Sequence, residues 1–209
     1  MADKPGLATH YESDAATIRS LYDDWAGQYD ADLAEWGYVA PVRAVELLAE
    51  RCGPTAQVLD VGCGTGLVGA ALSDAGFVDV VGVDISSDSL DIAAKTGVYR
   101  ALAEVDLTEL PTSLPDELFG ALICVGVMSY LPDVEAVCRE FARVVESDGI
   151  IVLTQRTDLF ASRATGEAYA ALVEDGTWEE LVISDPAPYL PGHDEYAEID
   201  VIYGVFRRL

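Results

Sequence analysis

Three acidic residues and a glycine-rich turn form the most chemically suggestive pattern in the sequence. The stretch DVGCGTG, residues 60–66, places Asp60 directly before three glycines at alternate positions. Glycine lets a chain turn sharply and lets a ligand lie against bare backbone. Asp84 in GVDIS and Asp106 in EVDL each follow an apolar run in the same way. The pattern predicts a ligand site made of glycine backbone and carboxylates.

The elements that must position these residues form an alternating series. Short apolar, β-branched runs alternate with amphipathic segments from residue 57 onward, which is typical of a parallel sheet covered by helices. In such a sheet, ligands bind outside the carboxyl ends of the strands. Strands are expected at 57–61, 78–83, 98–103, 120–125, 149–154, 178–185 and 197–209, and helices at 13–29, 41–52, 65–75, 87–95, 133–146 and 160–175.

The charge around the turn bears on which ligand it holds. Gly64-x-Gly66-x-x-Gly69 also matches the dinucleotide fingerprint, with Asp84 following at the expected distance. A dinucleotide places its pyrophosphate at the helix N-terminus, where a carboxylate on Asp60 would oppose it. S-adenosylmethionine instead carries an ammonium and a sulfonium and has no phosphate. The pattern therefore favours this ligand, with an NAD-dependent oxidoreductase or a non-catalytic cofactor-binding partner protein as alternatives.

The ordered motifs resemble those of class I S-adenosylmethionine-dependent methyltransferases over roughly residues 20–209. The stretches YDDWAGQYD, WGYVAP, ICVGVMSYL and PYLPGHDEY resemble more narrowly the Williams–Beuren syndrome region methyltransferase-like group. The resemblance implies an α/β, doubly wound, Rossmann-like fold with a seven-stranded, mostly parallel sheet whose last strand is antiparallel. It implies a single domain, residues 1–209, in which an N-terminal helical lid segment (1–53) precedes the core (54–209).

The resemblance also implies which residues meet the cofactor, S-adenosylmethionine, whose product is S-adenosylhomocysteine, with no metal. Asp60 and the glycine turn would meet the methionine part, Asp84 the ribose, and Asp106 the adenine. An N-terminal aromatic segment would cover the cofactor. The expected contacts are Tyr22, Trp25, Tyr29, Asp60, Gly62, Cys63, Gly64, Thr65, Gly66, Asp84, Ile85, Ser86, Asp106, Leu107, Cys124 and Val125.

The methyl acceptor is expected at the same edge of the sheet, reached by the ends of the fourth and fifth strands and by the loop 186–195. His193 in that loop is the candidate general base. Arg156 would bind an acidic group of the substrate or pair with a surface carboxylate. The sequence after the fourth strand, CVGVMSY, lacks the (N/D)PP(Y/F) motif of enzymes that methylate exocyclic base amines. The expected acceptor contacts are Met128, Tyr130, Gln155, Arg156, Tyr189 and His193.

Composition restricts the class of partner. The chain has 209 residues, with 37 acidic and 12 basic side chains, and a net charge of −25. Such a field repels nucleic acid and anionic lipid, so we expect a small-molecule acceptor, for O- or N-methylation, and a monomer or homodimer. The acidity suits high salt or steers a cationic substrate. Four cysteines without ligand spacing, no secretory signal and no long apolar run predict a reduced, cytoplasmic protein.

Overall fold

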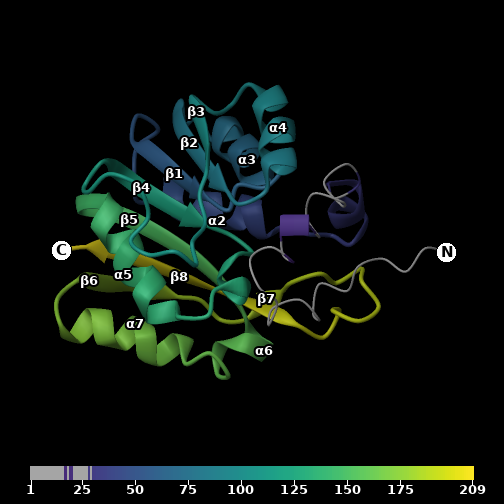
Figure 1. The fold of residues 1–209 in the computed structure, drawn as a ribbon. Helices are drawn as coiled ribbons and strands as arrows, with labels where there is room; N and C mark the ends of the chain where they lie inside the picture. Colours follow the sequence, from purple (N-terminus) through teal and green to yellow (C-terminus); the bar gives the residue numbers. More distant parts are fainter. Residues whose placement is uncertain (1–16, 18, 21–27, 29) are drawn as a thin grey trace.

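The computed structural model describes residue 17, residues 19–20, residue 28 and residues 30–209. Its centre is a twisted sheet in the order β3-β2-β1-β4-β5-β8-β6, to which the short β7 adds beside β8 (Figure 1). The strands are β1 (Gln57–Val61), β2 (Asp79–Asp84), β3 (Ala101–Glu104), β4 (Phe119–Cys124), β5 (Val145–Arg156), β6 (Trp178–Ile183), β7 (Ala187–Pro188) and β8 (Asp200–Arg208). The predicted α/β fold class, mostly parallel with an antiparallel strand, is confirmed.

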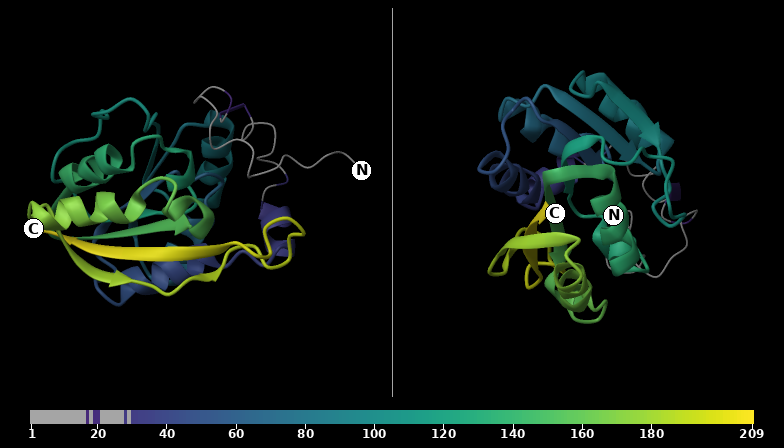
Figure 2. Two further views of the ribbon diagram at one scale, coloured as in Figure 1. Left: turned by 90° about the horizontal axis from the view of Figure 1, so that it is seen from below. Right: turned by 90° about the vertical axis from the view of Figure 1, so that its left-hand side faces the viewer.

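Helices cover both faces of the sheet. They are α2 (Ala40–Ala49), α3 (Leu67–Asp74), α4 (Ser87–Thr96), α5 (Val134–Val144), α6 (Thr157–Phe160) and α7 (Thr165–Glu174), with a 3-10 turn, η1, at Met128–Tyr130. In the left view of Figure 2, α5 and α7 lie on one side of the strands and α2 lies on the other. This arrangement leaves the carboxyl ends of the parallel strands open as a common edge.

The alternation of side chains along each strand divides the core in two. Val58 and Val152 belong to the cluster beneath α2 and α3. Leu59 and Ile151, each one residue away, belong to the cluster beneath α5 and α7. Because successive strand residues point to opposite faces, every central strand must be apolar on both faces. The continuous apolar runs in the sequence have this origin.

The C-terminal part brings a loop back to the open edge. β8 pairs antiparallel with both β5 and β6, so β6 runs parallel to β5. The chain after β6 therefore leaves at the same edge as the chain after β1, β2 and β4. This confirms the expectation that the loop 186–195 reaches the ligand side of the sheet.

Two segments far apart in the sequence interlock at this edge. Gly192 donates its amide to the carbonyl of Trp36 at 2.9 Å. A Cβ on Gly192 would lie 3.0 Å from the Cα of Trp36, so only glycine permits this approach. The His193 ring also packs edge-on against Trp36, with centroids 4.5 Å apart. The motifs WGYVAP and PYLPGHDEY thus form one packed unit.

Several element boundaries differ from those expected. The helix expected at 65–75 begins at 67, because Gly66 adopts a left-handed φ of 106° and caps it. The strand expected at 98–103 begins only at Ala101. β5 is longer than expected because it continues directly from α5 at Val145. The helix expected at 160–175 is two helices, separated by Ala164 in the left-handed region.

The described residues contain no helix that is both long and apolar enough to cross a membrane. All four cysteines of the chain are free thiols, and three of them are buried. Burial raises the pKa of Cys63 and Cys124 well above the ordinary value, so these thiols are held in the neutral form.

Candidate functional site

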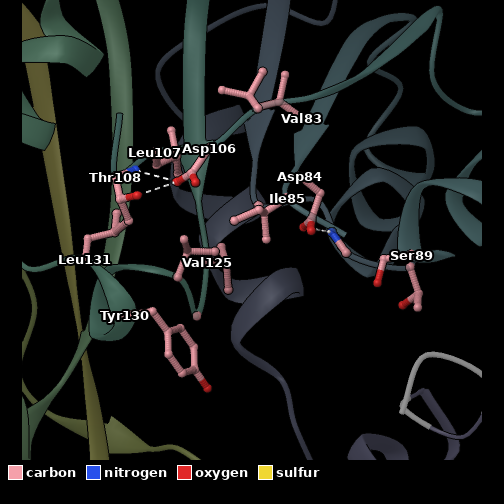
Figure 3. A pocket seen from close by; sticks show the side chains of 16 residues that line it. Val83, Asp84, Ile85, Ser89, Asp106, Leu107, Thr108, Val125, Tyr130 and Leu131 are labelled. Atoms are coloured by element: carbon pink, nitrogen blue, oxygen red, sulfur yellow. Dashed lines mark hydrogen bonds between the residues drawn. The ribbon is translucent and has the colours of Figure 1, made fainter. Parts of the chain in front are cut away.

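A pocket of about 850 Å³, its open mouth included, lies at the carboxyl ends of β1, β2 and β4 (Figure 3). The close view shows Asp84 and Asp106 on two walls, Ile85 and Val125 between them, and Tyr130 at the end away from Val83. The lining residues are Gly62, Gly64, Thr65, Val83, Asp84, Ile85, Ser89, Val105, Asp106, Leu107, Thr108, Val125, Gly126, Val127, Tyr130 and Leu131. None of these described residues is a lysine, arginine or histidine.

Asp84 ends β2 and organises the turn on either side of it. Its Oδ2 accepts the amide of Gly64 at 2.8 Å, and its Oδ1 accepts the amide of Ser86 at 2.9 Å. Ser86 in turn caps α4 by accepting the amide of Ser89 at 3.1 Å. The carboxylate is thereby held at the pocket wall in one orientation, where it can accept hydrogen bonds from a ligand.

Asp106 lies two residues beyond the end of β3. Its Oδ1 accepts both the amide and the hydroxyl of Thr108, at 2.8 and 2.7 Å. This is the turn geometry typical of aspartate. Because both bonds use Oδ1, Oδ2 remains able to accept from a ligand amino group. Asp106 can therefore hold the turn through Oδ1 and bind a ligand through Oδ2.

The glycine turn depends on a close approach between β1 and β4. Gly62 has φ +67°, and a Cβ there would lie 2.1 Å from Cγ2 of Val127. The amides of Gly62 and Cys63 both donate to the carbonyl of Val83, at 2.8 and 3.0 Å. The turn is thus tied to β2 on one side and pressed against the loop after β4 on the other. Only glycine satisfies the space and the dihedral angle together.

Asp60 lies behind this turn instead of in the pocket. Its side chain is completely buried, and its Oδ2 accepts the hydroxyl of Tyr99 at 2.7 Å. The same hydroxyl accepts the amide of Gly69 at 3.1 Å. Burial, together with the nearby Asp84, raises the pKa of Asp60 to about 7, against the effect of the Tyr99 hydrogen bond. Asp60 therefore braces the turn from behind, and the acidic character of the pocket comes from Asp84 and Asp106.

We expect Asp60→Asn to remove a pH dependence of stability. Because the folded protein holds the Asp60 proton up to about pH 7, the stabilisation is greatest below the ordinary pKa of 3.8 and is lost as the pH rises through 7. The free energy of unfolding of the wild type should fall by about 2–3 kcal/mol more than that of Asp60→Asn between pH 5 and pH 8. Urea unfolding of both proteins at the two pH values measures this difference. Parallel pH profiles would contradict it.

The structure brings nine of the expected contacts into the pocket lining. They are Gly62, Gly64, Thr65, Asp84, Ile85, Asp106, Leu107, Val125 and Tyr130. Others support the site from outside: Gly66 and Ser86 cap helices, and Cys124 is completely buried. Cys63 packs beneath the turn, with its Sγ near Gly82. The expected contacts Tyr22, Trp25 and Tyr29 lie outside the described residues.

Two described residues of the N-terminal segment do reach this edge. Asp30 accepts the hydroxyl of Thr65 at 2.5 Å, so it is attached to the glycine turn itself. Arg19 pairs with Glu104, the last residue of β3, at 2.7 Å. These contacts are consistent with the expectation that the segment covers the pocket.

Of the residues expected to contact the acceptor, only one lines the pocket. Tyr130 lines the pocket, but Met128 is completely buried among core residues. Met128 follows the apolar run of β4, and its side chain points to the core face beneath α5. The others lie beyond Tyr130 and outside the pocket lining: Gln155, Arg156, Tyr189 and His193.

The geometry of His193 disfavours it as general base. Its Nδ1 accepts the amide of Glu195 at 3.1 Å, so the neutral ring carries its proton on Nε2. The ring is also held edge-on between Trp36 and Tyr196. The acceptor nitrogen of the ring is therefore engaged by the backbone of its own loop. This contact depends on the backbone of the loop and was not apparent from the residue types.

Seven lining residues are not among the expected contacts: Val83, Ser89, Val105, Thr108, Gly126, Val127 and Leu131. Six of them, all but Ser89, are next to an expected contact in the sequence, so proximity to those contacts was an available signal. Ser89 lies one helical turn after Ser86, and helical spacing would have indicated it.

Comparisons with known proteins identify the family of the chain. The family described as a methyltransferase domain matches residues 59–153. Methyltransferase-like protein 27 of Homo sapiens is 37% identical over 183 residues, covering 84% of this chain and 74% of that protein. A ubiquinone biosynthesis O-methyltransferase of Neisseria meningitidis is 30% identical over 108 residues, covering 49% and 44% of the two chains.

The fold is shared with a solved structure at low sequence identity. The crystal structure of an S-adenosylmethionine-dependent methyltransferase from Mesorhizobium loti has a TM-score of 0.66 and 17% identity, over 83% of this chain and all of that one. The family match begins within β1 and ends within β5, and so contains the glycine turn, Asp84 and Asp106. On the family match and the long similarity to methyltransferase-like protein 27, the chain belongs to the class I S-adenosylmethionine-dependent methyltransferases.

Proposed function

We propose that the protein transfers the methyl group of S-adenosylmethionine to an oxygen or nitrogen atom of a small molecule. The observation that carries this proposal is the charge of the pocket. Among the described residues that line it, only Asp84 and Asp106 carry charged side chains, and its floor is the bare backbone of Gly62 and Gly64. A cationic nucleoside without phosphate is complementary to such a lining.

The residues present fit this cofactor. Asp84 would accept hydrogen bonds from the ribose hydroxyls, and Ile85 and Val125 offer apolar surface for the adenine. Asp106 would accept from the adenine amino group through Oδ2. The turn 62–64 would receive the methionine part, where any side chain on Gly62 would collide with Val127. These residues would hold the cofactor by its nucleoside, and Tyr130 lines the same pocket.

When bound, S-adenosylmethionine would supply an electrophilic methyl carbon. A lone pair of the acceptor would form the new carbon–oxygen or carbon–nitrogen bond. The carbon–sulfur bond would break at the same time, and its electron pair would pass to sulfur. The protein contributes placement and exclusion of water. Val125, Val127 and Leu131 form the apolar wall at that end of the pocket. The acceptor proton leaves to solvent, because His193 is not placed to receive it.

We further propose that the chain belongs to the Williams–Beuren syndrome region methyltransferase-like group. The similarity to methyltransferase-like protein 27 extends over most of both chains, as a narrow grouping requires. Two of the motifs that suggested the group, WGYVAP and PYLPGHDEY, pack against each other through Gly192 and Trp36. Their co-occurrence therefore has a structural reason, since neither segment keeps its place without the other.

The alternative of an NAD-dependent oxidoreductase is disfavoured by the same charges. The described lining offers no arginine or lysine to offset the phosphate charge of a dinucleotide. Only a measurement of methyl transfer distinguishes an enzyme from a non-catalytic cofactor-binding protein.

Calorimetric titration with S-adenosylmethionine, S-adenosylhomocysteine and NAD tests the proposal. We expect both sulfur nucleosides to bind and NAD to produce no saturable heat. Binding of NAD without binding of S-adenosylmethionine would overturn it. A screen of small-molecule acceptors then measures release of S-adenosylhomocysteine and addition of one methyl group by mass spectrometry. Cofactor binding without turnover on any acceptor would favour the non-catalytic alternative.

A further inference from the structure

A buried arginine lies at the end of β5, next to the strand that supplies the pocket wall. Arg156 is 5% exposed. Its Nε and Nη2 donate to the two carboxylate oxygens of Asp158, at 3.0 and 2.6 Å. Such a two-point pair fixes the plane of the guanidinium. Nη1, on the remaining edge, makes no hydrogen bond to any residue that the structure describes.

Two tyrosine rings enclose this guanidinium. Its Cζ lies 5.2 Å from the ring centroid of Tyr196 and 5.7 Å from that of Tyr189. Both rings are at least nine-tenths buried. Aromatic faces at these distances stabilise the cation without using its N–H donors. We call Arg156, Tyr189 and Tyr196 the arginine–tyrosine cluster.

The cluster borders the pocket at Tyr130. Burial raises the pKa of Tyr189, and the charge of Tyr130 raises it further. Tyr38 packs edge-on against Tyr189, with centroids 5.6 Å apart, and its hydroxyl approaches Gly126 of the pocket wall. The Tyr130 hydroxyl points away from Asp106, out of the nucleoside part of the pocket (Figure 3). The cluster therefore adjoins the end where the methyl group would be presented.

The hydrogen-bonding capacity left on Arg156 is that of a donor, Nη1. The two oxygens of Asp158 both accept from Arg156, so this pair is held by two hydrogen bonds. The preceding residue, Gln155, does not join the cluster, because successive strand residues point to opposite faces of the sheet. Its side chain is 2% exposed, and its Oε1 accepts from Ser129 and from the amide of Arg156.

We infer that the methyl acceptor is a planar, aromatic acid whose carboxylate is bound by Nη1 of Arg156 beside Tyr130 and Tyr189. The inference rests on the proposed function and specifies its substrate class. The tyrosine rings provide flat apolar surface for an aromatic ring, and the remaining guanidinium edge of Arg156 is complementary to a carboxylate. Because the whole chain carries −25, an acid is held here only by such a local contact.

Binding of matched acids and amides to the protein saturated with S-adenosylhomocysteine tests this inference. The probes are benzoate, phenylacetate and indole-3-acetate, each compared with its primary amide by calorimetry. We expect at least one acid to bind about tenfold more tightly than its amide, the effect of a hydrogen bond to a charged group. Arg156→Gln should abolish that preference while the affinity for S-adenosylhomocysteine stays unchanged. Arg139→Gln, an exposed arginine on α5, is the control and should keep it.

The outcomes separate the two proposals. If S-adenosylhomocysteine does not bind the wild type, the proposed function and this inference both fail. If it binds but no acid is preferred over its amide, or if the preference persists in Arg156→Gln, only the inference is overturned. Should Arg156→Gln not fold, Arg156→Lys takes its place. Lysine keeps the charge but loses the planar fork, so the acid preference must fall at least about threefold for the inference to stand.

Discussion

Replacing Asp84 with alanine is expected to weaken binding of S-adenosylmethionine at least about 100-fold. The carboxylate would accept two ribose hydroxyls, and each hydrogen bond to a charged group contributes about 1.5–3 kcal/mol. The substitution also removes the acceptor for the amides of Gly64 and Ser86, which loosens the glycine turn. Calorimetry with S-adenosylmethionine measures the loss.

Two control variants separate binding from folding. Asp84→Asn keeps one acceptor oxygen without the charge, so its affinity should lie between those of the wild type and the alanine variant. Asp79→Ala removes a carboxylate at the opposite end of β2, where it pairs with Arg100 on the surface. That variant should bind S-adenosylmethionine as the wild type does. Equal affinities for Asp84→Ala and the wild type would show that the ribose lies elsewhere.

Gly62→Ala is expected to destabilise the fold by about 3 kcal/mol and to abolish cofactor binding. Its Cβ would lie 2.1 Å from Val127, and φ is +67°, where alanine is strained. The added methyl group forces apart the turn after β1 and the loop after β4, which pack against each other and both line the pocket. Urea unfolding and calorimetry measure the two effects.

Gly53→Ala is the matched control. Its Cβ would meet no atom within 4 Å, and its φ is not in the left-handed region. The stability of this variant should remain within about 0.5 kcal/mol of the wild type. Combining Gly62→Ala with Val127→Ala removes the closest collision and should restore part of the stability. If Gly62→Ala alone unfolds at the same urea concentration as the wild type, the turn is not confined as described.

Much of the fold could be predicted because its signals are local. The apolar runs that became β1, β2 and β4 are readable one strand at a time, and the proline at the first turn of α2 marks a helix start. The ends of α3 and β3 were less predictable. Gly66 could have continued a helix or capped it, and the choice depends on its contact with Tyr99 and Thr96.

The candidate site also contains residues whose positions could be predicted from the sequence and residues whose positions could not. Asp84 and Asp106 could be placed at the pocket from sequence, because parallel strands bring their carboxyl ends to one edge. The burial of Asp60 could not be predicted, since the partner of its Oδ2, Tyr99, is 39 residues away in the sequence. The absence of a Cβ at Gly69 and Gly82 makes room for that tyrosine. Nothing in the local sequence indicates it.

The turn DVGCGTG and the acidic strand ends were enough to indicate a cofactor site, because backbone conformation and strand direction follow from residues near in sequence. Which carboxylates face the cofactor, and that Arg156 is enclosed by Tyr189 and Tyr196, follow only from packing. Side chains from β5 and from the loop after β6 meet there because β8 inserts between β5 and β6 and returns that loop to the open edge. Long-range pairing of this kind leaves no periodic signal in the chain, so the enclosure of Arg156 by two tyrosine rings could not be predicted from the sequence.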